Sequence, residues 1–119
     1  MESILVHHPD VIESAAIGVP DEIKGMALVA FCVLKSTSGT TEEINHRREQ
    51  IRTELKEMII ADMGKPLAPK AILFVSDLPK TRNAKVMRRI IRSAYLRLEP
   101  GDISSLVNPD AVEEIKRAR

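Results

Sequence analysis

The chain has 119 residues, of which 44% are hydrophobic and 29% are charged, and its formal net charge is +1. This length suits one compact domain, and the composition is typical of a folded globular protein rather than a disordered one. A single cysteine excludes an internal disulfide, and no apolar stretch approaches the roughly 20 residues that a membrane span needs. We therefore expect a cytoplasmic protein without a membrane contact.

The first half of the chain predicts two helices and two strands. The expected elements, in chain order, are a short helix over 2–8, a strand over 11–19, a strand over 26–34 and a helix reaching about residue 63. Residues 26–34 form an unbroken apolar run, which favours a strand covered on both faces. Thr40 and Glu43 have the spacing of a capping box at the start of the long helix, and Gly64 suits its end.

The second half predicts a third strand and a second long helix. Residues 71–75 fit a strand, and Asn83 is a good N-cap for a helix that starts at about Ala84. Residues 100–119, with a short charged helix from Ala111, are expected to form a peripheral tail. This order of elements predicts an α+β fold, a small two-layer α/β sandwich in which helices pack on a sheet of about three strands.

The clearest chemical signal is a basic segment without any acid between residues 80 and 98. Its members are Lys80, Arg82, Lys85, Arg88, Arg89, Arg92 and Arg97. With Asn83 as N-cap, Lys85 would lie in the first turn of the helix, where a cation opposes the helix dipole. Free helix amides beside a lysine favour an anion site, although spacing alone favours a solvated basic face. Asp77 is expected to order the loop before Lys80, and the dispersed histidines do not predict a metal site.

The segment Leu78–Arg89 resembles the last motif of AMP-forming acyl-CoA synthetases, which usually reads Pro-Lys-Thr-Xaa-Ser-Gly-Lys. Further segments resemble other motifs of that family, in order and at compatible spacing: Glu2-Ser3, Val6–Val11, Ala15–Asp21, Lys24-Gly25, Gly64–Pro69 and Gly101-Asp102. Two departures stand out. Asn83-Ala84 replaces Ser-Gly, which removes glycine's backbone freedom beside Lys85. No basic residue occurs in Ile60-Ala61-Asp62, where the family often has one that contacts CoA.

The resemblance implies that the chain is the mobile C-terminal domain of an acid–CoA ligase of the acetyl- or propionyl-CoA synthetase type. Lys85 would be the catalytic lysine, and Lys80, Arg82 and Arg88 would contact phosphates of ATP or CoA or a domain interface. The reaction uses ATP, with Mg²⁺, and CoA, and the partner is a large N-terminal adenylation domain. We expect residues 1–119 to be one domain, a fragment that is inactive alone.

Two other readings of the chain are a module that binds nucleic acid through the basic helix and a free-standing module that regulates a synthetase in trans. Against the first, Phe31, Phe74 and Tyr95 are the only aromatic residues, and both phenylalanines fall inside predicted strands. Platforms on which bases could stack are therefore missing. We expect no nucleic-acid partner. The sequence encoded before Met1 would decide the second alternative.

Overall fold

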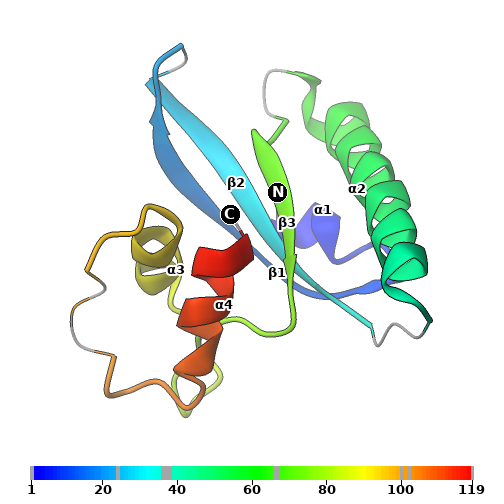
Figure 1. Cartoon of the computed structure of the whole chain (residues 1–119). Coiled ribbons are helices and arrows are strands. Elements are labelled where there is room, and N and C mark those ends of the chain that lie inside the picture. Colours follow the sequence, from blue (N-terminus) through cyan, green and yellow to red (C-terminus); the bar gives the residue numbers. More distant parts are fainter. Residues whose placement is uncertain are drawn as a thin grey trace.

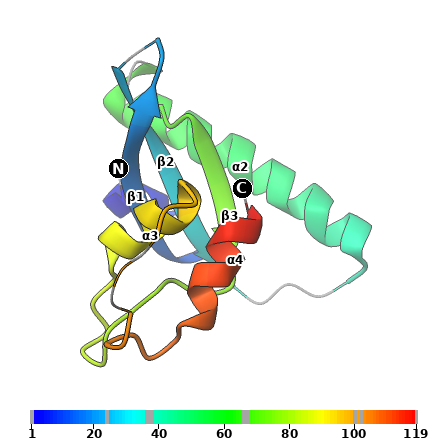
Figure 2. The ribbon, with the colours of Figure 1, turned by 60° about the vertical axis from the view of Figure 1, so that its left-hand side comes forward.

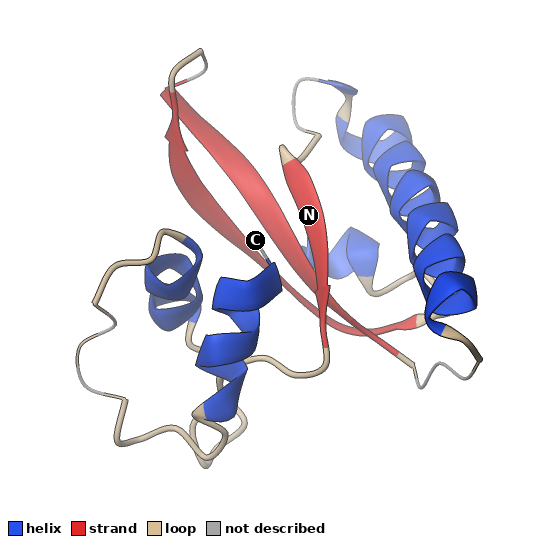
Figure 3. Ribbon diagram, in the orientation of Figure 1, coloured by secondary structure: helices blue, strands red, loops and turns tan. Residues whose placement is uncertain are grey.

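The computed structural model describes residues 2–23, 25–35, 39–65, 68–99, 101 and 103–118. Along the chain it has α1 (Glu2–Leu5), β1 (Val11–Asp21), β2 (Gly25–Leu34), α2 (Thr41–Met63), β3 (Ala71–Val75), α3 (Arg88–Tyr95) and α4 (Asp110–Ala118) (Figure 1). The strand order is β1-β2-β3, with β1 antiparallel to β2 and β2 parallel to β3. Figure 3 shows this sheet in red. The α+β class and the three-stranded sheet are therefore confirmed.

Helices cover both faces of the sheet. In Figures 1 and 2, α1 and α2 lie on one side and α3 and α4 on the other, so the domain has one layer more than the expected two. The central strand β2 explains this. Phe31 packs in the core with α3 and α4, whereas Ala30 and Cys32 pack against α2. The prediction that this apolar run is a strand buried on both faces is confirmed.

The long helix α2 supplies the crossover that a parallel β2–β3 pair requires. It begins and ends where its capping residues predict. The hydroxyl of Thr40 accepts the N–H of Glu43 at 3.2 Å, and Gly64 follows the helix with a φ of 91°. Ile51, Leu55 and Ile59 form its buried stripe over the sheet. None of the described helices is both long and apolar enough to cross a membrane.

The start of α3 differs from the prediction. The helix begins at Arg88 rather than at about Ala84, because Asn83 lies in a turn and caps no helix. Its end forms two hydrogen bonds back onto the last turn, from Arg97 N–H to the Ala94 carbonyl (3.1 Å) and from Leu98 N–H to the Ser93 carbonyl (2.8 Å). This is the Schellman arrangement, with Arg97 in the left-handed position (φ 58°).

The expectation that residues 100–119 are peripheral is corrected for α4. This helix packs against α3 and β3, and Ile115 is fully buried in the same core as Phe31. Ala111 and Val112 are also buried. The charged residues of α4 hid this apolar stripe, because they flank Ala111, Val112 and Ile115 in the sequence. The helix completes the layer that carries the Lys85 region.

Candidate functional site

The predicted site lies on a small hairpin between β3 and α3. Lys80 and Val86 form an antiparallel bridge, and the Thr81 N–H donates to the Lys85 carbonyl at 3.0 Å. The Ala84 N–H donates to the Thr81 carbonyl at 2.9 Å and closes the turn. Ala84 itself is in the left-handed region, with a φ of 61°. Lys85 therefore lies on the return arm of a closed hairpin. The prediction that it lies in the first turn of a helix is wrong.

The side chain of Lys80 holds this hairpin onto the domain. Its Nζ donates to a carboxylate oxygen of Glu13 on β1 at 2.6 Å and to Asp77 Oδ1 at 3.3 Å. Burial lowers the pKa of Lys80, but the hydrogen bonds to Glu13 and Asp77 outweigh it, so the pKa lies above its ordinary value. The ammonium stays charged and already contacts two carboxylates. The role of Lys80 as a phosphate contact stays a prediction, and its position in the structure is that of an internal tie.

Asp77 and Asn108 complete this tie. Asn108 Oδ1 accepts the Lys80 N–H at 2.9 Å, and its Nδ2 donates to Asp77 Oδ2 and to the Leu78 carbonyl, both at 2.7 Å. Burial raises the pKa of Asp77, but the hydrogen bonds from Asn108, Leu78 N–H and Lys80 together lower it. The prediction that Asp77 orders the loop before Lys80 is confirmed. Asn108, from the segment before α4, had not been identified from the sequence.

Arginines of α3 also have partners in the domain. Arg88 binds the carboxylate of Glu2 through its Nε, at 2.7 Å, and its second terminal nitrogen. Arg92 donates from Nε to the Gly18 carbonyl of β1 at 2.9 Å. Two basic side chains of α3, of which Arg88 was predicted to contact phosphate, therefore bind α1 and β1. This arrangement weakens the nucleic-acid hypothesis, which required a free basic face.

Lys85 and Arg82 differ from these residues. Both side chains are exposed, and neither has a hydrogen bond or ion pair within the described part of the chain. A backbone that is fixed by hydrogen bonds thus presents two cations to whatever lies outside the domain. A long side chain on a closed hairpin is suited to place its ammonium beside an anion that another domain holds.

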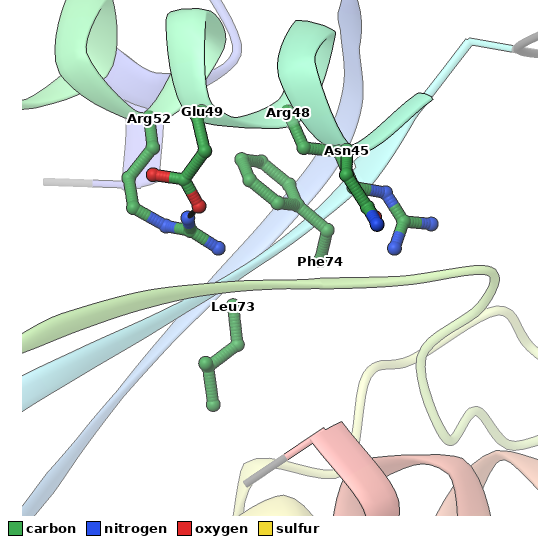
Figure 4. Close-up of a pocket in the computed structure, with 6 residues that line it drawn as sticks. All are labelled: Asn45, Arg48, Glu49, Arg52, Leu73 and Phe74. Atoms are coloured by element: carbon green, nitrogen blue, oxygen red, sulfur yellow. Dashed lines mark hydrogen bonds and ion pairs between the residues drawn. The ribbon is translucent and has the colours of Figure 1, made fainter. Parts of the chain in front are cut away.

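A separate hollow lies between α2 and β3, on the other face of the sheet (Figure 4). Arg52 lines it and donates from Nε to the Ile72 carbonyl at 2.8 Å, lies over the Phe74 ring at 5.1 Å and pairs with Glu49. Figure 4 shows Leu73 pointing away from Phe74, toward the opposite face. The hollow lies across the sheet from the Lys85 hairpin, so it does not extend the site.

Three further features of the sequence concern Cys32, metal ligands and the motifs of the resemblance. Cys32 is buried, and burial raises the pKa of its thiol to about 12, which makes it an inert core residue as expected. Among the described residues, no three or more histidine, cysteine or acidic side chains are grouped to hold a metal ion. Of the motifs that carried the resemblance, Lys24, Pro66, Leu67 and Asp102 lie outside the described residues.

The sequence profile of the AMP-binding enzyme C-terminal domain matches residues 1–85, so that Lys85 is the last matched residue. The chain belongs to this family. It is 42% identical over 115 residues to the acetyl-coenzyme A synthetase of Methanothrix thermoacetophila, and this alignment covers 97% of the chain and 16% of the relative. It is 44% identical over 118 residues to acetyl-coenzyme A synthetase 1 of Candida albicans, covering 97% of this chain and 17% of that protein.

Solved structures agree with this membership. The crystal structure of Brucella canis acyl-CoA synthetase matches with a TM-score of 0.65 and 33% identity, over 81% of this chain and 16% of that chain. The resemblance to the C-terminal domain of acyl-CoA synthetases is confirmed. The profile match ends at Lys85, but the synthetase alignments cover nearly the whole chain, α3 and α4 included. The chain spans about a sixth of the length of these relatives.

Proposed function

We propose that this domain is the mobile part of an ATP-dependent, AMP-forming acid–CoA ligase and supplies Lys85 to the adenylation step. The observation that carries the proposal is the contrast within the hairpin. Lys80 is paired with Glu13 and Asp77 and fixes the backbone of the hairpin. Lys85, on the same hairpin, has an exposed side chain without a partner among the described residues.

The chemistry that this arrangement suits is the meeting of two anions. A carboxylate oxygen attacks the α-phosphorus of ATP, forming the acyl-adenylate and releasing pyrophosphate. Negative charge builds on the phosphoryl oxygens in that step, and a pre-positioned ammonium stabilises it without reorganisation. In the second step the thiol of CoA attacks the acyl carbonyl, and AMP leaves. We assign no Mg²⁺ ligand to this chain, since the metal would travel with ATP.

The ATP pocket and the acyl pocket are proposed to belong to a large N-terminal adenylation domain, as the relatives' lengths suggest. The 119-residue domain described here would rotate between the two steps and present a different face for thioester formation. Arg82, at the turn of the Lys85 hairpin, is the candidate phosphate contact whose side chain is exposed and has no partner among the described residues, whereas Arg88 is paired with Glu2. We also propose a cytoplasmic location, and no activity for the 119-residue chain by itself.

A chimera tests the proposal. Residues 1–119 would replace the matching segment of the Pyrobaculum aerophilum acetyl-coenzyme A synthetase, to which this chain is 42% identical over 118 residues. In the chimera, Lys85→Ala is expected to reduce acetate-dependent release of pyrophosphate by roughly 10²–10³-fold, the usual effect of losing one stabilising charge contact. Lys56→Ala, an exposed lysine on α2, is the matched control. Equal effects of the two variants would overturn the proposal.

A further inference from the structure

Glu2 connects three elements that are far apart in the sequence. Its carboxylate accepts two hydrogen bonds from Arg88, one at 2.7 Å from Nε, and a third from the Ala16 N–H of β1 at 2.8 Å. Its backbone carbonyl accepts from the Ser14 hydroxyl at 2.9 Å. One side chain of α1 therefore contacts both β1 and the first residue of α3. A bidentate pair of this kind fixes direction as well as distance.

The start of α3 needs such a partner. Met87 occupies the N-cap position and forms no side-chain cap, and the first turn contains no acidic residue. Arg88 and Arg89 instead place two cations at the positive end of the helix dipole, which is unfavourable. The carboxylate of Glu2 places a negative charge beside this end of the helix. Consistent with this pairing, the hydrogen bond from Arg88 holds the pKa of Glu2 below its ordinary value against the effect of burial.

The same contact reaches the Lys85 hairpin. Arg88 follows Lys85 by three residues, and the two intervening residues are fixed, Val86 by its bridge to Lys80 and Met87 by its N–H bond to the Pro79 carbonyl at 2.9 Å. The return arm of the hairpin thus passes directly into a helix end that Glu2 holds. The Lys80 tie fixes the hairpin at its entry, and the Glu2 contact is the corresponding tie at its exit.

We propose that Glu2 is a positioning residue for Lys85, acting through Arg88. The inference rests on the proposed function, in that its catalytic consequence requires Lys85 to act in adenylation. Glu2 touches no reacting atom in this account. It sets where the hairpin joins α3, and so where the Lys85 ammonium can reach. Arg88, expected from the sequence to contact phosphate, becomes the link between the two.

The test uses the chimera described above with Glu2→Gln, Arg88→Gln and the double variant. We expect Glu2→Gln to lower kcat for acetate-dependent pyrophosphate release by about 10-fold, because misplacing a catalytic group by about 1 Å costs up to about 10²-fold. The KM values for ATP and acetate should stay within about twofold, since Glu2 binds neither substrate. The double variant should be no slower than the slower single variant, because both changes break one contact. Glu57→Gln, on the exposed face of α2, is the matched control.

Amide hydrogen exchange in the 119-residue chain gives a readout that needs no catalysis. Glu2→Gln should speed exchange at Met87, whose N–H bonds the Pro79 carbonyl, and at Ile90 by about tenfold, and leave Leu55 of α2 unchanged. If Lys85→Ala abolishes adenylation while Glu2→Gln keeps full kcat, the inference fails and the proposed function stands. If Lys85→Ala is harmless, the proposed function fails. Additive losses in the double variant, or unchanged exchange at Met87, would overturn the role of Glu2.

Discussion

Ala84, the residue before Lys85, holds a left-handed backbone with a φ of 61°. This conformation costs an alanine about 1–2 kcal/mol, because its Cβ crowds the carbonyl oxygen. Glycine avoids that cost but loses about 0.5–1 kcal/mol more conformational entropy on folding. Ala84→Gly should therefore stabilise the domain by about 0.5–1 kcal/mol. The hairpin closes with an alanine, so its hydrogen bonds outweigh the strain that glycine would remove.

Urea unfolding of the 119-residue chain, followed by circular dichroism, measures this difference. With a denaturant dependence of about 1.5 kcal/mol per M, the midpoint should rise by about 0.3–0.7 M. The matched control is Ala61→Gly on the exposed face of α2, where the same substitution should cost about 0.5–1 kcal/mol. A lower midpoint for Ala84→Gly, or equal shifts of both variants in one direction, would refute the assigned geometry of the Lys85 hairpin.

Two further predictions concern the supports of the site. Ile115→Ala should destabilise the chain by about 3 kcal/mol in the same urea assay, since α4 completes the core. The control is Val107→Ala, at a side chain that is 59% exposed, which should change stability by less than about 0.5 kcal/mol. The pKa values of Glu2 and Asp77 are lowered in the folded chain. Each carboxylate therefore stabilises the fold when the pH is above its ordinary pKa, which is 4.5 for Glu2 and 3.8 for Asp77. That stability is lost as the pH falls through the lowered values. Acid unfolding followed by circular dichroism should show this loss, and Asp77→Asn should make it shallower; an unchanged acid transition would contradict the tie.

Local sequence signals predicted the elements whose boundaries depend on nearby residues. The helix α2 ends at Met63, before Gly64, and β3 has the bounds 71–75 that its apolar run indicated. The position of β2 between two helical layers followed from its lack of alternation. Asn83 was misleading because the same residue type favours N-caps and turns. Here the turn formed, and α3 began later, at Arg88.

The supports of the site could not be predicted in this way. Glu2 and Arg88 are 86 positions apart, and Glu13 and Lys80 are 67 apart, so no local spacing relates them. Their pairing depends on the sheet, which brings β1 beside the hairpin and α3. The same reason explains why Lys80 was grouped with Lys85. In sequence both are lysines of one motif, and only the fold gives one of them two carboxylates.

The role of Lys85 is tested most directly by separating the two half-reactions of the chimera. We expect Lys85→Ala to abolish most acetate-dependent release of pyrophosphate from ATP, while thioester formation from pre-made acetyl-adenylate and CoA continues at nearly the parental rate. Loss of one charge contact predicts a roughly 10²–10³-fold decrease in the first rate alone. An equal decrease in both rates, or an unchanged first rate, would contradict the account.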